Sequence, residues 1–200
     1  MEVTTCSAGK CVDTSVRADP LNSVAHLCCT LQDYWEGRYE AALASLRVAL
    51  RLDPANVQNR CYGVYLMAAN GRLDEARALL DEWLTDTPEH FYARSMTPLL
   101  YAFEGRHNES SSLMGRVLAD EQQRTAARSD PGAVLWGAEA FAMNGETDEA
   151  IEWLEHGLEL GLINYPFLAE KDRFLDGLRG DQRFQRLMER VKKEWEEFEA

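Results

Sequence analysis

Cysteine is the residue type in this chain that could hold a metal ion or act as a nucleophile, and it is confined to the first third. The five cysteines are Cys6, Cys11, Cys28, Cys29 and Cys61. Cys6, Cys11, His26 and one of Cys28 or Cys29 would supply four ligands for zinc. Their spacing matches none of the paired-ligand patterns of zinc sites. An odd number of cysteines favours free, reduced thiols. We therefore predict no metal site.

Other catalytic groups are scattered. The four histidines, at 26, 90, 107 and 156, form no metal-binding pair, and no phosphate-binding glycine loop or nucleophile elbow occurs. Acidic pairs such as Asp74-Glu75 and Asp148-Glu149 follow a glycine, where they favour the positive end of a helix. We predict no catalytic residues, no cofactor and no enzyme. A small-molecule sensor or an enzyme that uses the cysteine-rich first third stays as a distant alternative.

Composition excludes further classes of function. The formal net charge is −13, which disfavours binding to nucleic acid and to an anionic membrane surface. No apolar run reaches the roughly 18–20 residues of a membrane span. The first ten residues are polar and lack the order of a signal peptide. We expect a cytoplasmic protein that binds a protein or peptide, with no nucleic acid and no membrane as partner.

The elements that position these residues recur with a period of about 34 residues, which is typical of paired-helix repeats. Gly37, Gly71 and Gly105 share this spacing, and so do Pro20, Pro54 and Pro88. A glycine ends one helix in a left-handed conformation, and a proline stops the next. The pattern divides the chain into units 23–56, 57–90, 91–130 and 131–161. Residues 1–22 are a tail or the remnant of an earlier unit, and residues 162–200 form a closing segment.

The array resembles tetratricopeptide repeats. The small residues at the helix contacts carry this resemblance: Thr30, Ala42 and Ala49 in the first unit, and Ala138, Ala150 and Gly157 in the fourth. Tyr39 and Leu73 fill the position after the turn. The second and third units depart from the pattern, because Val64, Trp83, Pro98 and Val117 replace small residues, so we expect looser or rotated packing there. Six extra residues lie within 121–130, and we expect them to extend a helix end or a loop.

The resemblance implies an all-α, right-handed helix-turn-helix solenoid of about four repeats that binds a partner in a concave groove. The groove positions carried over from the family are Leu27, Leu31, Tyr34, Cys61, Tyr65, Tyr92, Leu99, Leu135 and Glu139. Periodicity cannot separate groove from core, so some of these residues could be buried. The expected function is a protein-interaction scaffold or adaptor.

The closing segment is expected to end in a long amphipathic helix that Asp181 caps. Its apolar stripe is Phe184, Leu187, Met188, Val191, Trp195 and Phe198. The stripe could cover the open end of the array as a capping helix. Alternatively, Phe184, Leu187, Val191 and Trp195 could mediate a homodimer, or the stripe could occupy the array's own groove. Residues 170–187 also resemble the closing segment of bacterial signalling-associated repeat regions. This suggests, as an alternative function, a regulatory or self-association module of a larger signalling protein.

Overall fold

A computed structural model describes residues 16–199 of the chain. These residues form helices and turns without a strand, so the predicted all-α helical repeat class is confirmed for them. The chain divides into two compact units, Met1–Leu79 and Leu80–Ala200, and the division falls inside one helix. Cys6, Cys11 and most of the predicted N-terminal tail, 1–22, lie outside the described residues.

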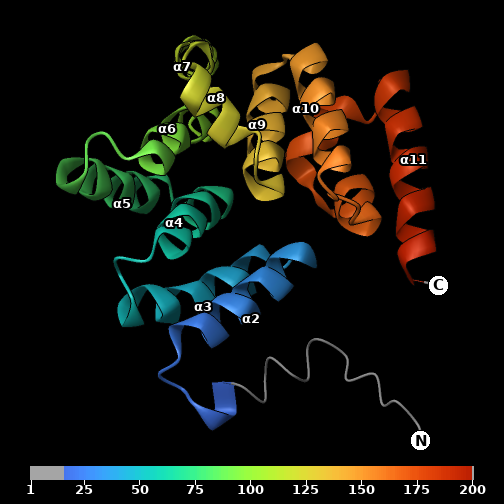
Figure 1. Ribbon diagram of the computed structural model, residues 1–200. Helices are drawn as coiled ribbons and strands as arrows, with labels where there is room; N and C mark the ends of the chain where they lie inside the picture. Colours follow the sequence, from blue (N-terminus) through green and yellow to red (C-terminus); the bar gives the residue numbers. More distant parts are fainter. Residues whose placement is uncertain (1–15, 200) are drawn as a thin grey trace, which may run out of the picture. The chain divides into compact units, whose positions relative to one another are not determined.

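The first unit contains the helices α2 (Ser23–Trp35), α3 (Tyr39–Leu52) and α4 (Val57–Ala69), and the start of α5 (Leu73–Asp86). Figure 1 shows α2 lying beside α3. Asn22 and Asn56 cap α2 and α4, because their side-chain oxygens accept hydrogen bonds from Ala25 N and Asn59 N, both at 3.1 Å. Each helix pair thus begins at a defined residue.

The second unit contains most of the remaining helices, which are joined by short turns. They are α6 (Phe91–Phe103), α7 (His107–Ala119), α8 (Glu121–Ala127), α9 (Pro131–Asn144), α10 (Thr147–Glu159), a π-helical turn η1 (Phe167–Lys171), a 3-10 helix η2 (Arg173–Leu178) and α11 (Gln182–Glu199). Here α6 packs on α7, and α9 packs on α10.

Glycine closes the turns inside the pairs. Gly37, Gly71, Gly105 and Gly145 have φ between 73° and 80°, a left-handed conformation that side chains disfavour. The residue after each glycine donates a backbone hydrogen bond to a carbonyl of the preceding helix. For example, Arg38 N donates to Asp33 O at 2.8 Å, and Glu146 N donates to Phe141 O at 2.9 Å. The glycine signal in the sequence therefore marks real helix ends.

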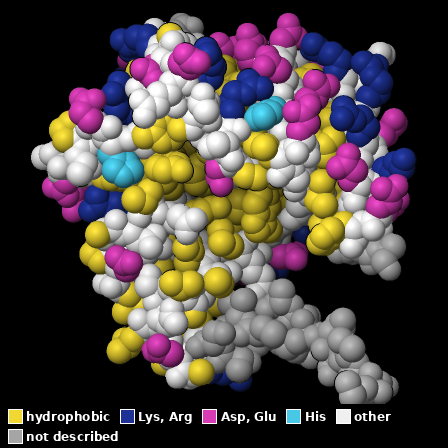
Figure 2. Space-filling model, in the orientation of Figure 1, with side chains coloured by type: hydrophobic (Ala, Val, Ile, Leu, Met, Phe, Trp, Pro, Cys, Tyr) yellow, Lys and Arg dark blue, Asp and Glu magenta, His cyan; other side chains and the backbone are white. Residues whose placement is uncertain are grey.

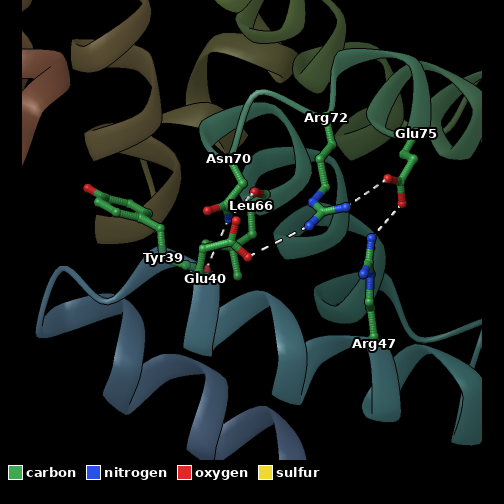
Figure 3. A network of polar contacts seen from close by, with 7 residues as sticks. All are labelled: Tyr39, Glu40, Arg47, Leu66, Asn70, Arg72 and Glu75. Carbon is green, nitrogen blue, oxygen red and sulfur yellow. Dashed lines mark hydrogen bonds and ion pairs between the residues drawn. The ribbon is translucent and has the colours of Figure 1, made fainter.

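Two buried or half-buried asparagines connect the helices of the first unit. Asn59 is fully buried, and its side-chain nitrogen donates to Ser23 Oγ, Ala49 O and Asp53 O at 3.1–3.3 Å. Asn70 donates to Tyr39 O at 3.0 Å and to Leu66 O at 2.7 Å (Figure 3). These bonds fix α4 to the pair before it.

Exposed ion pairs surround this junction without adding much to its stability. In Figure 3, Arg47 meets Glu75 at 2.6 Å, and Arg72 lies between Glu75 at 3.4 Å and Glu40 at 3.8 Å. Solvent-exposed pairs of this kind typically contribute about 0–1 kcal/mol each. The buried amides are therefore the stronger determinant of how these helices meet.

The six extra residues between the third and fourth pairs form a helix of their own. We expected them to extend a helix end or a loop. Instead α8 starts at Glu121, directly after Asp120, whose side chain accepts a hydrogen bond from Gln123 N at 2.9 Å. Asp120 is itself extended, with ψ at 121°, so it ends α7 and caps α8.

The closing segment has the order of one more helix pair, with a broken first helix. η1 and η2 stand where its first helix would lie, and η2 packs on α9. Asp181 precedes α11, as predicted, and its side chain accepts a hydrogen bond from Arg183 N at 2.7 Å. Phe184, Leu187, Met188 and Val191 are buried, so α11 is the predicted capping helix.

Candidate functional site

An apolar cavity lies inside the second unit, next to the inserted helix α8. Its volume is about 40 Å³, well above the roughly 10–15 Å³ that one water requires. Five helices, α6 to α10, contribute side chains to it. The lining residues are Phe91, Tyr92, Ser95, Met96, Leu99, Met114, Val117, Leu118, Ala127, Ala133, Trp136, Gly137 and Trp153.

Helix α6, which supplies one wall of the cavity, contains a proline that does not itself line it. Pro98 lies inside α6 and is buried, and it lacks the amide that would bond to the preceding turn. Ser110 of α7, which is also buried, donates to Pro98 O at 2.8 Å and accepts from Asn144 Nδ2 of α9 at 2.9 Å. Ser110 therefore connects α6, α7 and α9.

The opposite wall depends on a glycine. A Cβ at Gly137 of α9 would lie too close to the Trp153 ring, so only glycine lets that ring lie against the helix. Phe141 packs on the same ring at 5.6 Å between ring centres. Trp153 is thereby held as a rigid aromatic surface of the cavity.

The end of α8 and the turn after it are anchored to α10. Arg128 pairs with Glu152 at 2.9 Å and stacks over the Trp153 ring at 5.4 Å. His156 Nε2 donates to Arg128 O at 2.8 Å. These contacts hold Ala127, the α8 residue that lines the cavity, above Trp153.

The chemistry of the lining favours binding of apolar groups. Among the lining residues, none is an acid, a base, a histidine or a cysteine. Ser95 is already engaged, because its hydroxyl donates to Phe91 O at 3.0 Å. Tyr92 is 38% exposed and marks the solvent side of the cavity. Figure 2 shows charged side chains over α7, α8 and α10, with hydrophobic ones over part of α9.

Two of the predicted groove residues, Tyr92 and Leu99, line this cavity. The others lie elsewhere, and most of their side chains are buried: Leu27, Tyr34, Cys61, Tyr65, Leu135 and Glu139, with Leu31 half-buried. Tyr34 packs edge-on against Tyr65 at 5.5 Å, inside the first unit. Because they are buried, these side chains offer little surface to a partner.

Sequence reasoning missed most of the cavity wall, notably Met96, Met114, Trp136 and Trp153. Two features of the sequence nevertheless pointed to this region. Val117 replaces a small residue at a helix contact, which indicated looser packing, and it lines the cavity. The six-residue insertion also indicated a departure from regular stacking, and α8 borders the same space.

The other predicted sites can be placed briefly. Cys28 is exposed, Cys29 is half-buried and Cys61 is buried. His26 Nε2 is hydrogen-bonded to Pro20 O at 3.0 Å. Within residues 16–199 no group of three or more metal-ligating side chains is found. No helix in that range is long and apolar enough to cross a membrane.

The closing helix leaves little of its predicted self-association stripe uncovered. Phe184, Leu187 and Val191 are at most 3% exposed, whereas Trp195 is half-buried and Phe198 is 77% exposed. A homodimer through the whole stripe would require α11 to leave the chain's own core. Self-association through this helix stays a prediction.

Residues 36–97 match the family model of the tetratricopeptide repeat. This segment is therefore similar to tetratricopeptide repeats. Such repeats generally mediate protein–protein interaction. The matched repeat segment runs from the end of α2 into α6, so most of the cavity lining lies beyond it. No curated protein sequence matches the chain at a significant level.

Several solved structures are similar to the chain at low identity. MamA 41-end from Desulfovibrio magneticus RS-1 is 16% identical, with 89% of this chain and 97% of that chain covered and a TM-score of 0.46. PilW, a type IV pilus biogenesis factor, is 18% identical, with coverages of 94% and 88% and a TM-score of 0.48. A tetratricopeptide repeat protein from Parabacteroides merdae ATCC 43184 is 18% identical, with coverages of 94% and 72% and a TM-score of 0.45. At these scores the likenesses support no conclusion about function.

Proposed function

We propose that this chain is a non-enzymatic interaction scaffold, and that the cavity of the second unit receives one apolar side chain of a partner peptide. The observation that carries the proposal is an apolar cavity next to an exposed tyrosine, in a helical repeat protein. Apolar anchors that enter preformed pockets supply most of the affinity of many peptide complexes. The remainder of the peptide would cross the surface beside Tyr92.

The expected contribution to affinity follows from the apolar side chain that the cavity would bury. Burying one leucine-sized side chain contributes about 1.5–3 kcal/mol, which corresponds to roughly 10- to 150-fold in affinity. Blocking the cavity should therefore remove most of the binding of a short peptide. An aliphatic or aromatic anchor is expected, because the lining presents almost no polar atoms that need a partner.

A peptide library displayed on phage and selected on the whole chain tests this proposal. Ala133 lines the cavity and is half-buried near the start of α9, so Ala133→Leu places a branched side chain in the space without removing a contact. Selected peptides should share one apolar anchor. Their affinity, measured by fluorescence anisotropy, should fall at least about tenfold with Ala133→Leu.

Ala119→Leu is the matched control, since Ala119 is exposed on α7 and does not line the cavity. It should leave the affinity unchanged. Peptides that bind wild type and Ala133→Leu equally well would overturn the proposed use of the cavity. A selection that yields no binding peptide at all would count against the scaffold function itself.

A further inference from the structure

Residues 165–178, the first part of the closing segment, are held on α9 by a mainly apolar contact that contains two buried acids. Four apolar side chains of this part are at most 1% exposed: Phe167, Leu168, Leu175 and Leu178. Phe174 also meets Phe103 of α6 edge-on, with ring centres 4.9 Å apart. Into this contact project Glu139 of α9 and Asp172, both completely buried.

The two acids meet each other. One oxygen of Asp172, Oδ1, accepts a hydrogen bond from Phe174 N at 3.0 Å. The Glu139 side chain lies within hydrogen-bonding reach of it and acts to lower its pKa. For the other oxygen, Oδ2, no N–H or O–H donor is found among the described residues. Ionised carboxylates only accept hydrogen bonds, so a bond between the two acids requires that one of them carries a proton.

The charges around Asp172 come from α9, from η2 and from the residue after η2. Arg179 donates to Asp172 O at 2.9 Å and to Ala169 O, and its charge favours the ionised acid. Asp176 opposes ionisation, and Glu139 is the sole ionisable residue of α9. Burial outweighs the other effects and raises the pKa of Asp172 to about 6.

We infer that the buried acids Glu139 and Asp172 make attachment of residues 165–178 to α9 depend on their protonation, so that this part of the chain opens more readily as the pH rises. Ionisation of Asp172 places a negative charge in a dry contact beside Glu139, and the positive charge of Arg179 offsets it only in part. The apolar face of α9 that these residues cover would then be exposed more often. This adds regulation at the end of the array and does not depend on the proposed use of the cavity.

The direction and size of the pH effect follow from the linkage between protonation and opening. The pKa of Asp172 is raised in the closed form, so the stabilisation is fully present below the ordinary value near 4 and is lost as the pH rises through about 6. Between pH 5 and pH 7.5 the opening equilibrium of residues 165–178 should increase by about tenfold. Coupling of the two acids means that this midpoint belongs to the pair.

Hydrogen exchange of the whole chain, corrected for the intrinsic pH dependence of amide exchange, measures this opening. Protection factors in residues 167–178 should fall about tenfold from pH 5 to pH 7.5, relative to α6. Asp172→Asn keeps the bond from Phe174 N and supplies a permanent donor to Glu139. It should abolish the fall and raise protection at pH 7.5.

Glu139→Gln tests the same pair from α9 and keeps the test valid if Asp172→Asn does not fold. The matched control is Glu170→Gln, because Glu170 is an exposed acid in the same part of the chain, and it should retain the wild-type slope. A wild-type protein without a pH-dependent fall would overturn the inference. So would an unchanged slope in whichever of the two pair variants folds.

Discussion

Two junctions between successive helix pairs use the same repeat positions and differ in how they are filled. In the first unit, Asn59 is the third residue of α4, and it bonds to Ala49 O at 3.3 Å. In the second unit the corresponding third residue of α9 is Ala133, and Val117 of α7 corresponds to Ala49. Asn59 fills its junction with a buried amide, whereas Ala133 and Val117 border a cavity.

The comparison shows that the repeat specifies which residues meet but not whether the space between them is filled. At the first junction one polar side chain satisfies two backbone carbonyls and a hydroxyl at once. At the second junction the side chain is shorter, and α8 separates the neighbouring pairs. The position of a structural contact at the first junction thus corresponds to open space at the second.

Removing the amide should break the filled junction. Asn59→Ala removes the three hydrogen bonds that the buried amide donates, although Ala49 O still accepts a bond from Asp53 N at 2.9 Å. Loss of the three bonds is expected to cost about 1–3 kcal/mol in total. Urea unfolding should show this decrease in the free energy of unfolding. Gln58→Ala, at the exposed neighbouring position, should change it by less than about 0.5 kcal/mol. Equal effects of the two substitutions would mean that Asn59 does not stabilise the junction.

A second pair of substitutions compares Gly137 with Gly63, which are the seventh residues of α9 and α4. At Gly137 an added Cβ meets the Trp153 ring, whereas at Gly63 it meets Leu79 Cδ2 at 2.6 Å, the end of a flexible side chain. Gly137→Ala should therefore destabilise by about 1–2 kcal/mol, since rigid overpacking is not easily relieved. Gly63→Ala should be nearly neutral, because alanine in a helix gains about 1 kcal/mol over glycine. Thermal denaturation of both variants distinguishes them, and an equal loss would contradict the assigned role of Trp153.

The smallest expected effect concerns two aspartates of the closing segment whose pKa values are shifted in opposite directions. Hydrogen bonds from Arg183 lower the pKa of Asp181 to about 2, while burial raises that of Asp172. The contribution of Asp181 to stability is thus present above its ordinary pKa near 4 and is lost as the pH falls through about 2. Carboxyl carbon shifts in an NMR titration should show this midpoint. A midpoint near the ordinary value would mean that the Arg183 contacts do not persist in solution.

Much of the fold could be predicted because it depends on local chemistry. Gly37 and Gly71 mark helix ends through their backbone conformation, and Asp181 marks a helix start through its side chain. The separate helix α8 was not predicted, since the polar stretch looked like an extension. Its existence depends on Asp120 adopting an extended conformation that both ends one helix and caps the next.

The candidate site was less predictable because it depends on contacts between distant residues. Tyr34 and Tyr65 looked like groove residues by spacing, yet they pack on each other inside the first unit. The cavity wall requires Trp153 to lie against Gly137, which no single helix pattern contains. Periodicity identifies the apolar positions of a helix but does not determine which neighbour covers them.

The inserted helix α8 has a consequence for how such an array can diversify. It borders the cavity through Ala127, and the turn that follows it is fixed by Arg128 and His156. The glycine turns of the pairs on either side, at Gly105 and Gly145, lie outside it. Changes in α8 could therefore reshape the cavity entrance while the repeats keep their stability. Specificity and folding would then be separable traits, each open to selection on its own.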